Sequence, residues 1–172
     1  ARLSGTAPFR ATARTARHEN KTSTVNTAGH KGNVTMSIWK KPATPEQLNQ
    51  FASNSLVQHL GIEITRVGED TITATMPVDN RTRQPLGFLH GGASVVLAET
   101  LGSIAGYLAT EGEASVFGVE VNANHLRSIK AGVVTGTVKP VRVGRMLQVW
   151  DITLENEQGE AICVARLTTA VK

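Results

Sequence analysis

The sequence predicts an α+β fold in which one long helix packs against a mainly antiparallel sheet. Residues 91–110 form a single helix-like run of small and apolar side chains, with strand-like segments before and after it. Five or six such segments are present, and no internal repeat divides the chain. The 172 residues suffice for one domain with a substantial core.

The first half of the domain contains two short helices, a hairpin and a loop. Thr44 followed by Pro45 is typical of a helix start, an N-cap with proline in the first turn. The segment that follows fits one or two short helices, with apolar positions at Leu48, Phe51, Leu56 and Leu60. Residues 62–78 alternate in polarity around Gly68-Glu69-Asp70, which predicts a hairpin. Residues 79–90, with Pro85 and Gly87, predict a loop.

After the helix, residues 115–128, 132–144, 145–159 and 160–171 predict three or four further strands. Asn156 to Gly159 predicts the turn between the last two. Cys163, the only cysteine, lies in the last strand and is expected to be a core residue. A single cysteine excludes an intramolecular disulfide and disfavours a zinc site, which favours a cytoplasmic location.

Basic charge is concentrated in residues 1–35, which carry six Lys and Arg against one acidic residue. We expect this segment to be a disordered basic tail, because it has few large apolar side chains. It is a transit-like peptide, an artefact or an upstream segment translated in error. Residues 36–172 then form the folded domain, nearly neutral with twelve basic and thirteen acidic residues. This balance argues against nucleic-acid binding, and no apolar run is long enough to cross a membrane.

Glu99 is the only formally charged side chain between Gly91 and Thr110. Helical spacing separates it from an apolar stripe that is expected to lie on the sheet, Leu97, Leu101, Ile104 and Leu108. The face of Glu99 is instead small and apolar, and includes Gly92, Val95, Val96, Gly102, Ser103 and Gly106. Glycine is costly inside a helix, so Gly102 and Gly106 predict close approach of another backbone or of a ligand. Glu99 is therefore expected at an interface or in a pocket.

His90 and Gly91 stand where this helix should begin. Free N–H groups at a helix N-terminus bind anions and stabilise a developing oxyanion. His90 and Glu99 are nine residues apart, about 13 Å along the helix axis and on opposite sides. One chain cannot bring them together, but two chains with antiparallel helices could. If both are catalytic, the site spans a dimer interface.

Residues 81–103, "RTRQPLGFLHGGASVVLAETLGS", followed by "VNANHLRS" at residues 121–128, resemble the hotdog-fold acyl-CoA thioesterases of the 4-hydroxybenzoyl-CoA type that carry a catalytic Glu. The likeness extends over residues 37–171. It implies a long helix wrapped by a curved antiparallel sheet, in homodimers or homotetramers with active sites shared between chains. It implies no cofactor and no metal.

The resemblance assigns roles to individual positions. Glu99 is the nucleophile or general base, Gln84, His90 and Gly91 come from the partner chain, and Thr100 and Ser103 position the attacking water. The positions that match CoA or substrate contacts are Gly118, His125, Leu126, Arg127, Ser128, Arg142, Val143, Gly144, Arg145, Met146, Leu147 and Thr169. Leu86, Phe117 and the sequence Arg142–Arg145 depart from the family pattern around the acyl group and CoA.

The expected substrates are aromatic or hydroxylated acyl-CoA thioesters, such as the menaquinone precursor 1,4-dihydroxy-2-naphthoyl-CoA. One alternative is proofreading hydrolysis of mischarged aryl carrier proteins, with the carrier protein as a partner. Two others are a hotdog dehydratase of 3-hydroxyacyl thioesters and a non-catalytic acyl-CoA sensor. The dehydratases pair His with an acidic residue in other contexts, and a sensor requires a DNA-binding module that the tail does not provide.

Overall fold

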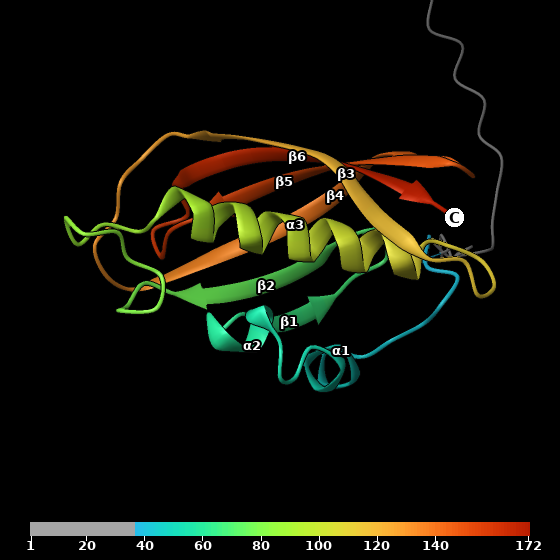
Figure 1. The fold of residues 1–172 in the computed structure, drawn as a ribbon, viewed down its shortest axis with the longest axis horizontal. Helices are drawn as coiled ribbons and strands as arrows, with labels where there is room; N and C mark the ends of the chain where they lie inside the picture. Colours follow the sequence, from blue (N-terminus) through green and yellow to red (C-terminus); the bar gives the residue numbers. More distant parts are fainter. Residues whose placement is uncertain (1–36) are drawn as a thin grey trace, which may run out of the picture. The chain divides into compact units, whose positions relative to one another are not determined.

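The computed structural model describes residues 37–172, which form three helices and one antiparallel sheet of six strands (Figure 1). The strand order is β1-β2-β4-β5-β6-β3, and α3 packs against the sheet. The elements are α1 (Pro45–Phe51), α2 (Leu56–His59), β1 (Glu63–Val67), β2 (Ile72–Pro77), α3 (Gly91–Leu108), β3 (Val116–His125), β4 (Val133–Val143), β5 (Leu147–Glu155) and β6 (Ala161–Val171). The predicted α+β class, central helix and hairpin are confirmed. The basic segment 1–35 lies outside the described residues.

The short helices form where the sequence predicts them, but only two of the four apolar positions noted in that segment are buried. Thr44 caps α1 in a capping box with Gln47, and Ser55 caps α2. Leu48 and Leu60 belong to the core, at 7% and 8% exposure. Phe51 and Leu56 point outward, at 87% and 56% exposure. The apolar pattern of the sequence therefore marks the helices but does not tell which of these side chains are buried.

The contact between α3 and the sheet is wider than one apolar stripe. Leu97, Leu101 and Leu108 are buried as predicted, while Ile104 is only half-buried. Gly102 and Gly106 are also buried, and the atoms nearest to them are side chains of the sheet. A Cβ at Gly102 would lie 2.5 Å from Leu167 Cδ2. These two glycines therefore let α3 approach its own sheet, which corrects the prediction that they lie on the face of Glu99, away from the sheet.

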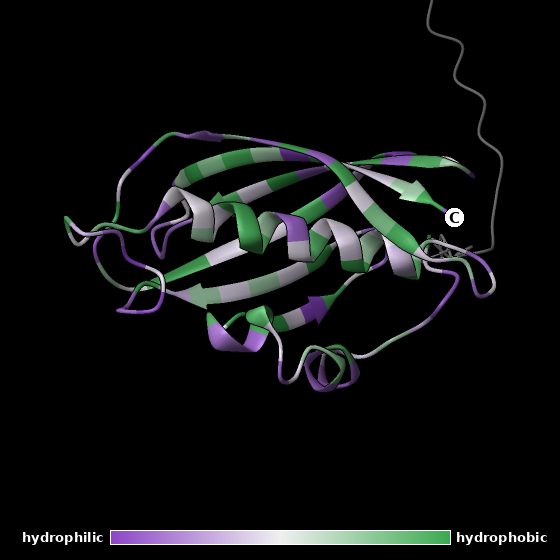
Figure 2. Cartoon of the chain, in the orientation of Figure 1, coloured by the Kyte–Doolittle hydropathy of each residue, from purple (hydrophilic) through white to green (hydrophobic). Residues whose placement is uncertain are grey.

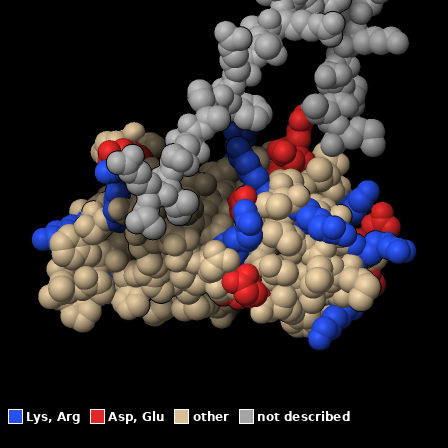
Figure 3. Space-filling model, turned by 90° about the horizontal axis from the view of Figure 1, so that it is seen from above, with Lys and Arg blue, Asp and Glu red and all other residues tan. Residues whose placement is uncertain are grey.

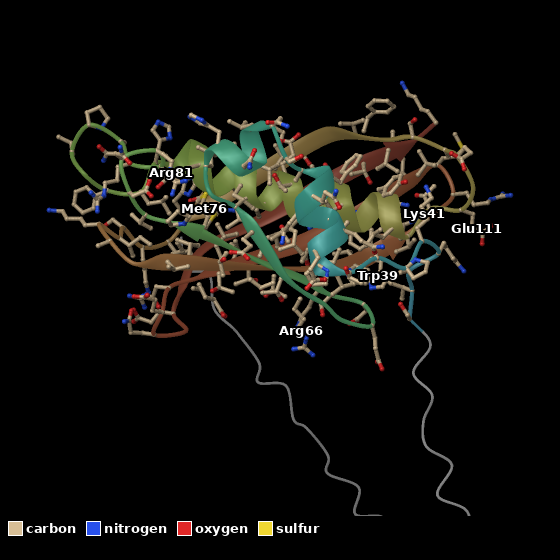
Figure 4. All side chains as sticks on the ribbon, turned by 90° about the horizontal axis from the view of Figure 1, so that it is seen from below. Trp39, Lys41, Arg66, Met76, Arg81 and Glu111 are labelled. Atoms are coloured by element: carbon tan, nitrogen blue, oxygen red, sulfur yellow. The ribbon has the colours of Figure 1, made fainter. Side chains whose placement is uncertain are left out.

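Residues 37–41 tie the start of the domain to the end of α3. Trp39 stacks on the buried Trp150, with ring centroids 6.3 Å apart, and its Nε1 donates to Gly68 O at 2.7 Å. The N–H groups of Lys40 and Lys41 donate to Leu108 O and so satisfy a carbonyl at the end of α3. Figure 4 shows Trp39, Lys41 and Glu111 at this end of the molecule and Arg81 at the other.

Hydropathy varies from residue to residue along the central strands (Figure 2), and burial alternates along β5, as expected when successive side chains point to opposite faces of the sheet. Cys163 faces the core at 1% exposure, and burial raises the pKa of its thiol, in agreement with a structural role. No helix within residues 37–172 is long and apolar enough to span a membrane.

Candidate active site

Glu99 lies on the wall of a groove of about 460 Å³ between α3 and the α1–α2 segment. Thr100 and Ser103, half-buried on the same helix, line the groove beside it. The rest of the lining is mainly apolar: Phe51, Ala52, Ser55, Leu56, Val57, Val96 and Ile104. Glu99 is the only ionisable residue among the lining residues. The predicted pocket carboxylate and its two hydroxyl neighbours thus lie together.

The Glu99 carboxylate leans over the backbone of β3. Its Oε1 is 3.1 Å from the position that a Cβ would occupy at Gly118. At this point the pairing of β3 with β6 shifts register, between Gly118 and Glu120. Such irregularities commonly occur beside active sites because they change the direction of the strand. Gly118, predicted as a substrate contact, is therefore a neighbour of the catalytic candidate.

The start of α3 presents a defined set of donors. His90 is the N-cap, and its Nδ1 accepts a hydrogen bond from Gly92 N at 2.8 Å. In the neutral ring the proton is then on Nε2, which is free to donate. Among the described residues, the Gly91 N–H has no hydrogen-bond acceptor. A backbone N–H and an imidazole N–H are thus available where the helix dipole favours negative charge.

The loop before α3 is held by its own polar contacts. Arg81 binds the Asp79 carboxylate through Nη2 at 2.6 Å and Nε at 3.1 Å, which lowers the pKa of Asp79 to about 2. Buried Thr82 accepts from His90 N at its carbonyl, at 2.8 Å. The Gln84 Oε1 accepts from Leu86 N, so the Gln84 amide nitrogen remains a donor. The loop therefore fixes both Gln84 and His90.

A second groove, of about 380 Å³, opens beside the start of α3. Gln84 and Gly91 line it together with His125, the last residue of β3, and with Leu126, Arg127 and Ser128, which follow that strand. The His125 ring lies directly against Gly91, with Nε2 2.7 Å from the position of a Cβ there. Several residues that were predicted to contact the thioester carbonyl or CoA thus line one groove, although Glu99 is not among them.

The β4–β5 hairpin lies at the opposite end of α3 (Figure 1). Val143, Gly144 and Arg145 line a third groove there, of about 450 Å³, with Lys40 and Glu111. Arg142, Met146 and Leu147 flank the same turn and are exposed. Thr169, by contrast, is fully buried and its hydroxyl donates to Gln148 Oε1 at 3.1 Å. Its side chain packs under the hairpin instead of lining a groove.

The predicted site residues thus fall into three separate groups within one chain. Glu99, Thr100 and Ser103 line the first groove, Gln84, Gly91 and residues 125–128 the second, and residues 143–145 the third. β3 is at the edge of the sheet and leaves one row of backbone groups without a strand partner in the described chain. A two-fold copy with α3 antiparallel could join groups that one chain keeps apart.

Sequence reasoning did not identify Phe51, Leu56, Val96 and Ile104 as lining residues of the Glu99 groove, or Phe88 and Leu89 of the second groove. One feature of the sequence could have pointed to Phe51 and Leu56: they flank the short segment between the two predicted helices.

Charged side chains are unevenly spread over the described surface. On the face shown in Figure 3, Lys and Arg stand among Asp and Glu, and a broad area carries no charged side chain. Within residues 37–172 no cluster of three or more His, Cys, Asp and Glu could hold a metal ion.

Comparison with known proteins places the chain in a family. The model of the thioesterase superfamily matches residues 86–163. The 1,4-dihydroxy-2-naphthoyl-CoA hydrolase of Escherichia coli is 54% identical over 78% of this chain and 98% of its own. The proofreading thioesterase EntH of Cronobacter turicensis is 53% identical with the same coverage.

Solved structures agree with this assignment. A thioesterase from Haemophilus influenzae superposes with a TM-score of 0.77 at 55% identity, covering 78% of this chain and 94% of its own. A thioesterase variant from Pseudomonas aeruginosa gives 0.77 at 48% identity, covering 78% and 98%. The chain belongs to the thioesterase superfamily and is a thioester hydrolase with the hotdog fold.

Proposed function

We propose that this thioesterase hydrolyses aromatic or hydroxylated acyl-CoA thioesters, with 1,4-dihydroxy-2-naphthoyl-CoA as the main candidate. The observation that carries the proposal is a lone carboxylate, Glu99, in a mainly apolar groove beside Thr100 and Ser103. A thioester carbonyl needs a nucleophile or base next to it and a space for its acyl group. A relative at 54% identity is named 1,4-dihydroxy-2-naphthoyl-CoA hydrolase, and this name supports the choice of acyl group.

Glu99 can act by two routes that share their products. As a general base it takes a proton from water, whose oxygen attacks the carbonyl carbon. As a nucleophile it attacks that carbon itself, and water then hydrolyses the resulting anhydride. In both routes the C–S bond breaks, the CoA sulfur leaves as a thiolate that is then protonated, and the acid is released. Thr100 and Ser103, which line the same groove, are proposed to orient the water.

The carbonyl oxygen requires donors that a single chain does not present at Glu99. Gln84, His90 and Gly91 of a second chain are proposed to supply them. The Gly91 N–H has no other acceptor among the described residues. Because His90 Nδ1 accepts the hydrogen bond from Gly92 N, the proton of the neutral His90 ring is on Nε2. Pairing of two β3 edge strands would set the two α3 helices antiparallel across a two-fold axis.

CoA is proposed to lie along the second groove and the hairpin of the other chain. His125, Leu126, Arg127 and Ser128 line the groove, and Arg142 and Arg145 stand at the exposed hairpin. Guanidinium groups are suited to the CoA phosphates. Arg127 is partly committed, because its Nη2 lies 3.7 Å from Glu160 Oε1.

A second candidate function is proofreading of aryl carrier proteins, since a relative at 53% identity is named for that activity. The same groove and carboxylate would act on a thioester carried by a protein instead of CoA.

The test compares 1,4-dihydroxy-2-naphthoyl-CoA with 2,3-dihydroxybenzoyl thioesters of CoA and of an aryl carrier protein. We expect the highest kcat/KM for the naphthoyl thioester, and a preference for the loaded carrier protein would favour the proofreading role. Glu99→Gln should lower kcat at least about 100-fold. Glu155→Gln, an exposed glutamate at the end of β5, is the control and should leave kcat unchanged. Near-normal kcat in Glu99→Gln would refute the assignment of Glu99.

A further inference from the structure

The wall of the groove opposite Glu99 carries two large apolar side chains that no other part of residues 37–172 covers. Phe51 ends α1 and Leu56 begins α2, and their exposed fractions are 87% and 56%. Both line the groove, together with Val96 and Ile104 of α3. Apolar surface of this kind inside a concave site is typical of a surface that a ligand covers.

The exposure of these side chains is imposed by a well-anchored backbone. Asn49, just before Phe51, exchanges two hydrogen bonds with Ile64 of β1, at 2.9 and 2.8 Å. Between the helices, Asn54 adopts a positive φ of 57°, and its N–H donates to Gln58 Oε1 at 2.7 Å. Ser55 donates to Ala52 O at 2.6 Å and caps α2. The wall is therefore positioned before any ligand arrives.

The reaction fixes which part of the substrate reaches this wall. The carbonyl carbon must approach Glu99 or its water, so the acyl group begins within a few ångströms of the carboxylate. Among the described residues, those suited to CoA by their positive charge line the other grooves or the hairpin, and none lines this one. The acyl group is the part of the substrate that matches the apolar lining.

We infer that Phe51 and Leu56 are specificity-determining residues, which hold an uncharged, ring-bearing acyl group opposite Glu99. The inference rests on the proposed function of Glu99. A ring can stack on Phe51 in an offset or edge-to-face arrangement and still contact Leu56. An acyl group with its own carboxylate would be repelled, because Glu99 is the only ionisable group among the described residues that line the groove. A two-carbon acyl group would be too short to reach the wall.

The experiment measures kcat/KM for benzoyl-CoA, acetyl-CoA and succinyl-CoA in the wild type, Phe51→Ala, Leu56→Ala and Phe51→Leu. Each alanine variant should lower kcat/KM for benzoyl-CoA about 10-fold, and acetyl-CoA should change less than about twofold. Phe51→Leu should recover part of the loss, since it restores apolar surface. Succinyl-CoA should be the poorest substrate of the wild type. Val164→Ala, which truncates an exposed apolar side chain on the outer face of the sheet, is the control and should change nothing.

The outcomes separate the inference from the proposed function. If the wild type hydrolyses these thioesters but the benzoyl-to-acetyl ratio is the same in both alanine variants, the inference is wrong and the function stands. Wild-type protein that hydrolyses no acyl-CoA would overturn both. Melting temperatures should stay within about two degrees of the wild type, because exposed side chains contribute little to stability. A changed ratio at unchanged melting temperature is therefore an effect on the acyl group alone.

Discussion

The carboxylate of Glu99 and the backbone of Gly118 lie in close contact, with Glu99 Oε1 3.1 Å from the position of a Cβ at Gly118. The contact joins the central helix to the edge strand at the point where the pairing of that strand shifts. Glycine leaves the carboxylate room to point along the groove. This relation leads to the first prediction.

Gly118→Ala should displace the Glu99 carboxylate and reduce kcat about 10-fold, because misplacement of a catalytic group by less than an ångström is costly. The fold should be retained, since Gly118 is exposed on β3. Steady-state kinetics and thermal melting check this. Asn122→Ala, an exposed residue further along β3, should be neutral in both measurements. A fully active Gly118→Ala enzyme would show that the carboxylate position is not critical.

Active sites shared between chains should be restored by mixing two inactive variants. One chain carries Glu99→Gln and the other carries Gln84→Ala with His90→Ala. After subunit exchange, half of the dimers are mixed and each holds one intact site, so about a quarter of wild-type activity should return. Exchange is verified with differently tagged chains by native mass spectrometry. Complete exchange with no recovered activity would place all catalytic groups within one chain.

Gly102→Ala should destabilise the fold, although alanine is the better helix former. A Cβ there would lie 2.5 Å from Leu167 Cδ2 and 3.2 Å from Leu167 Cβ, and Leu167 is fully buried. Overpacking costs about 1–3 kcal/mol, more than the gain of about 1 kcal/mol in helix propensity. In a Leu167→Ala background the same change should stabilise, which urea unfolding of the four proteins measures. Equal effects in both backgrounds would contradict the predicted contact.

Asp79→Asn should lower stability at neutral pH but not in strong acid. The Arg81 side chain lowers the pKa of Asp79 from 3.8 to about 2. A depressed pKa means that the carboxylate stabilises the fold above its unfolded-state pKa, and that this contribution is lost as the pH falls from 3.8 towards 2. The effect is small because the pair is exposed at the surface. Thermal melts should show a gap between the two proteins at pH 7 that narrows below pH 4, and a constant gap would contradict the ion-pair explanation.

Local patterns were sufficient to predict most elements and to single out Glu99 as the candidate for the central residue of the site. The 3.6-residue period and the single charge identified α3 and Glu99, and alternation around Gly68 predicted the β1–β2 hairpin. These features depend on neighbours close in the sequence, so they can be recognised without the fold. The predicted roles of Gln84, His90 and the CoA-contacting residues came from the family resemblance and stay predictions.

Tertiary packing alone decided which face of each element is covered. The sequence by itself determined that Phe51 and Leu56 are apolar and that α3 contains glycines. Only the assembled structure turned Phe51 and Leu56 outward into a groove and brought Gly102 against Leu167 of β6. The order of the strands, with β3 at the edge, likewise depends on pairings between segments more than 40 residues apart, such as Gly118 with Thr169. A periodic pattern shows that an element has two faces, but long-range contacts decide what each face meets.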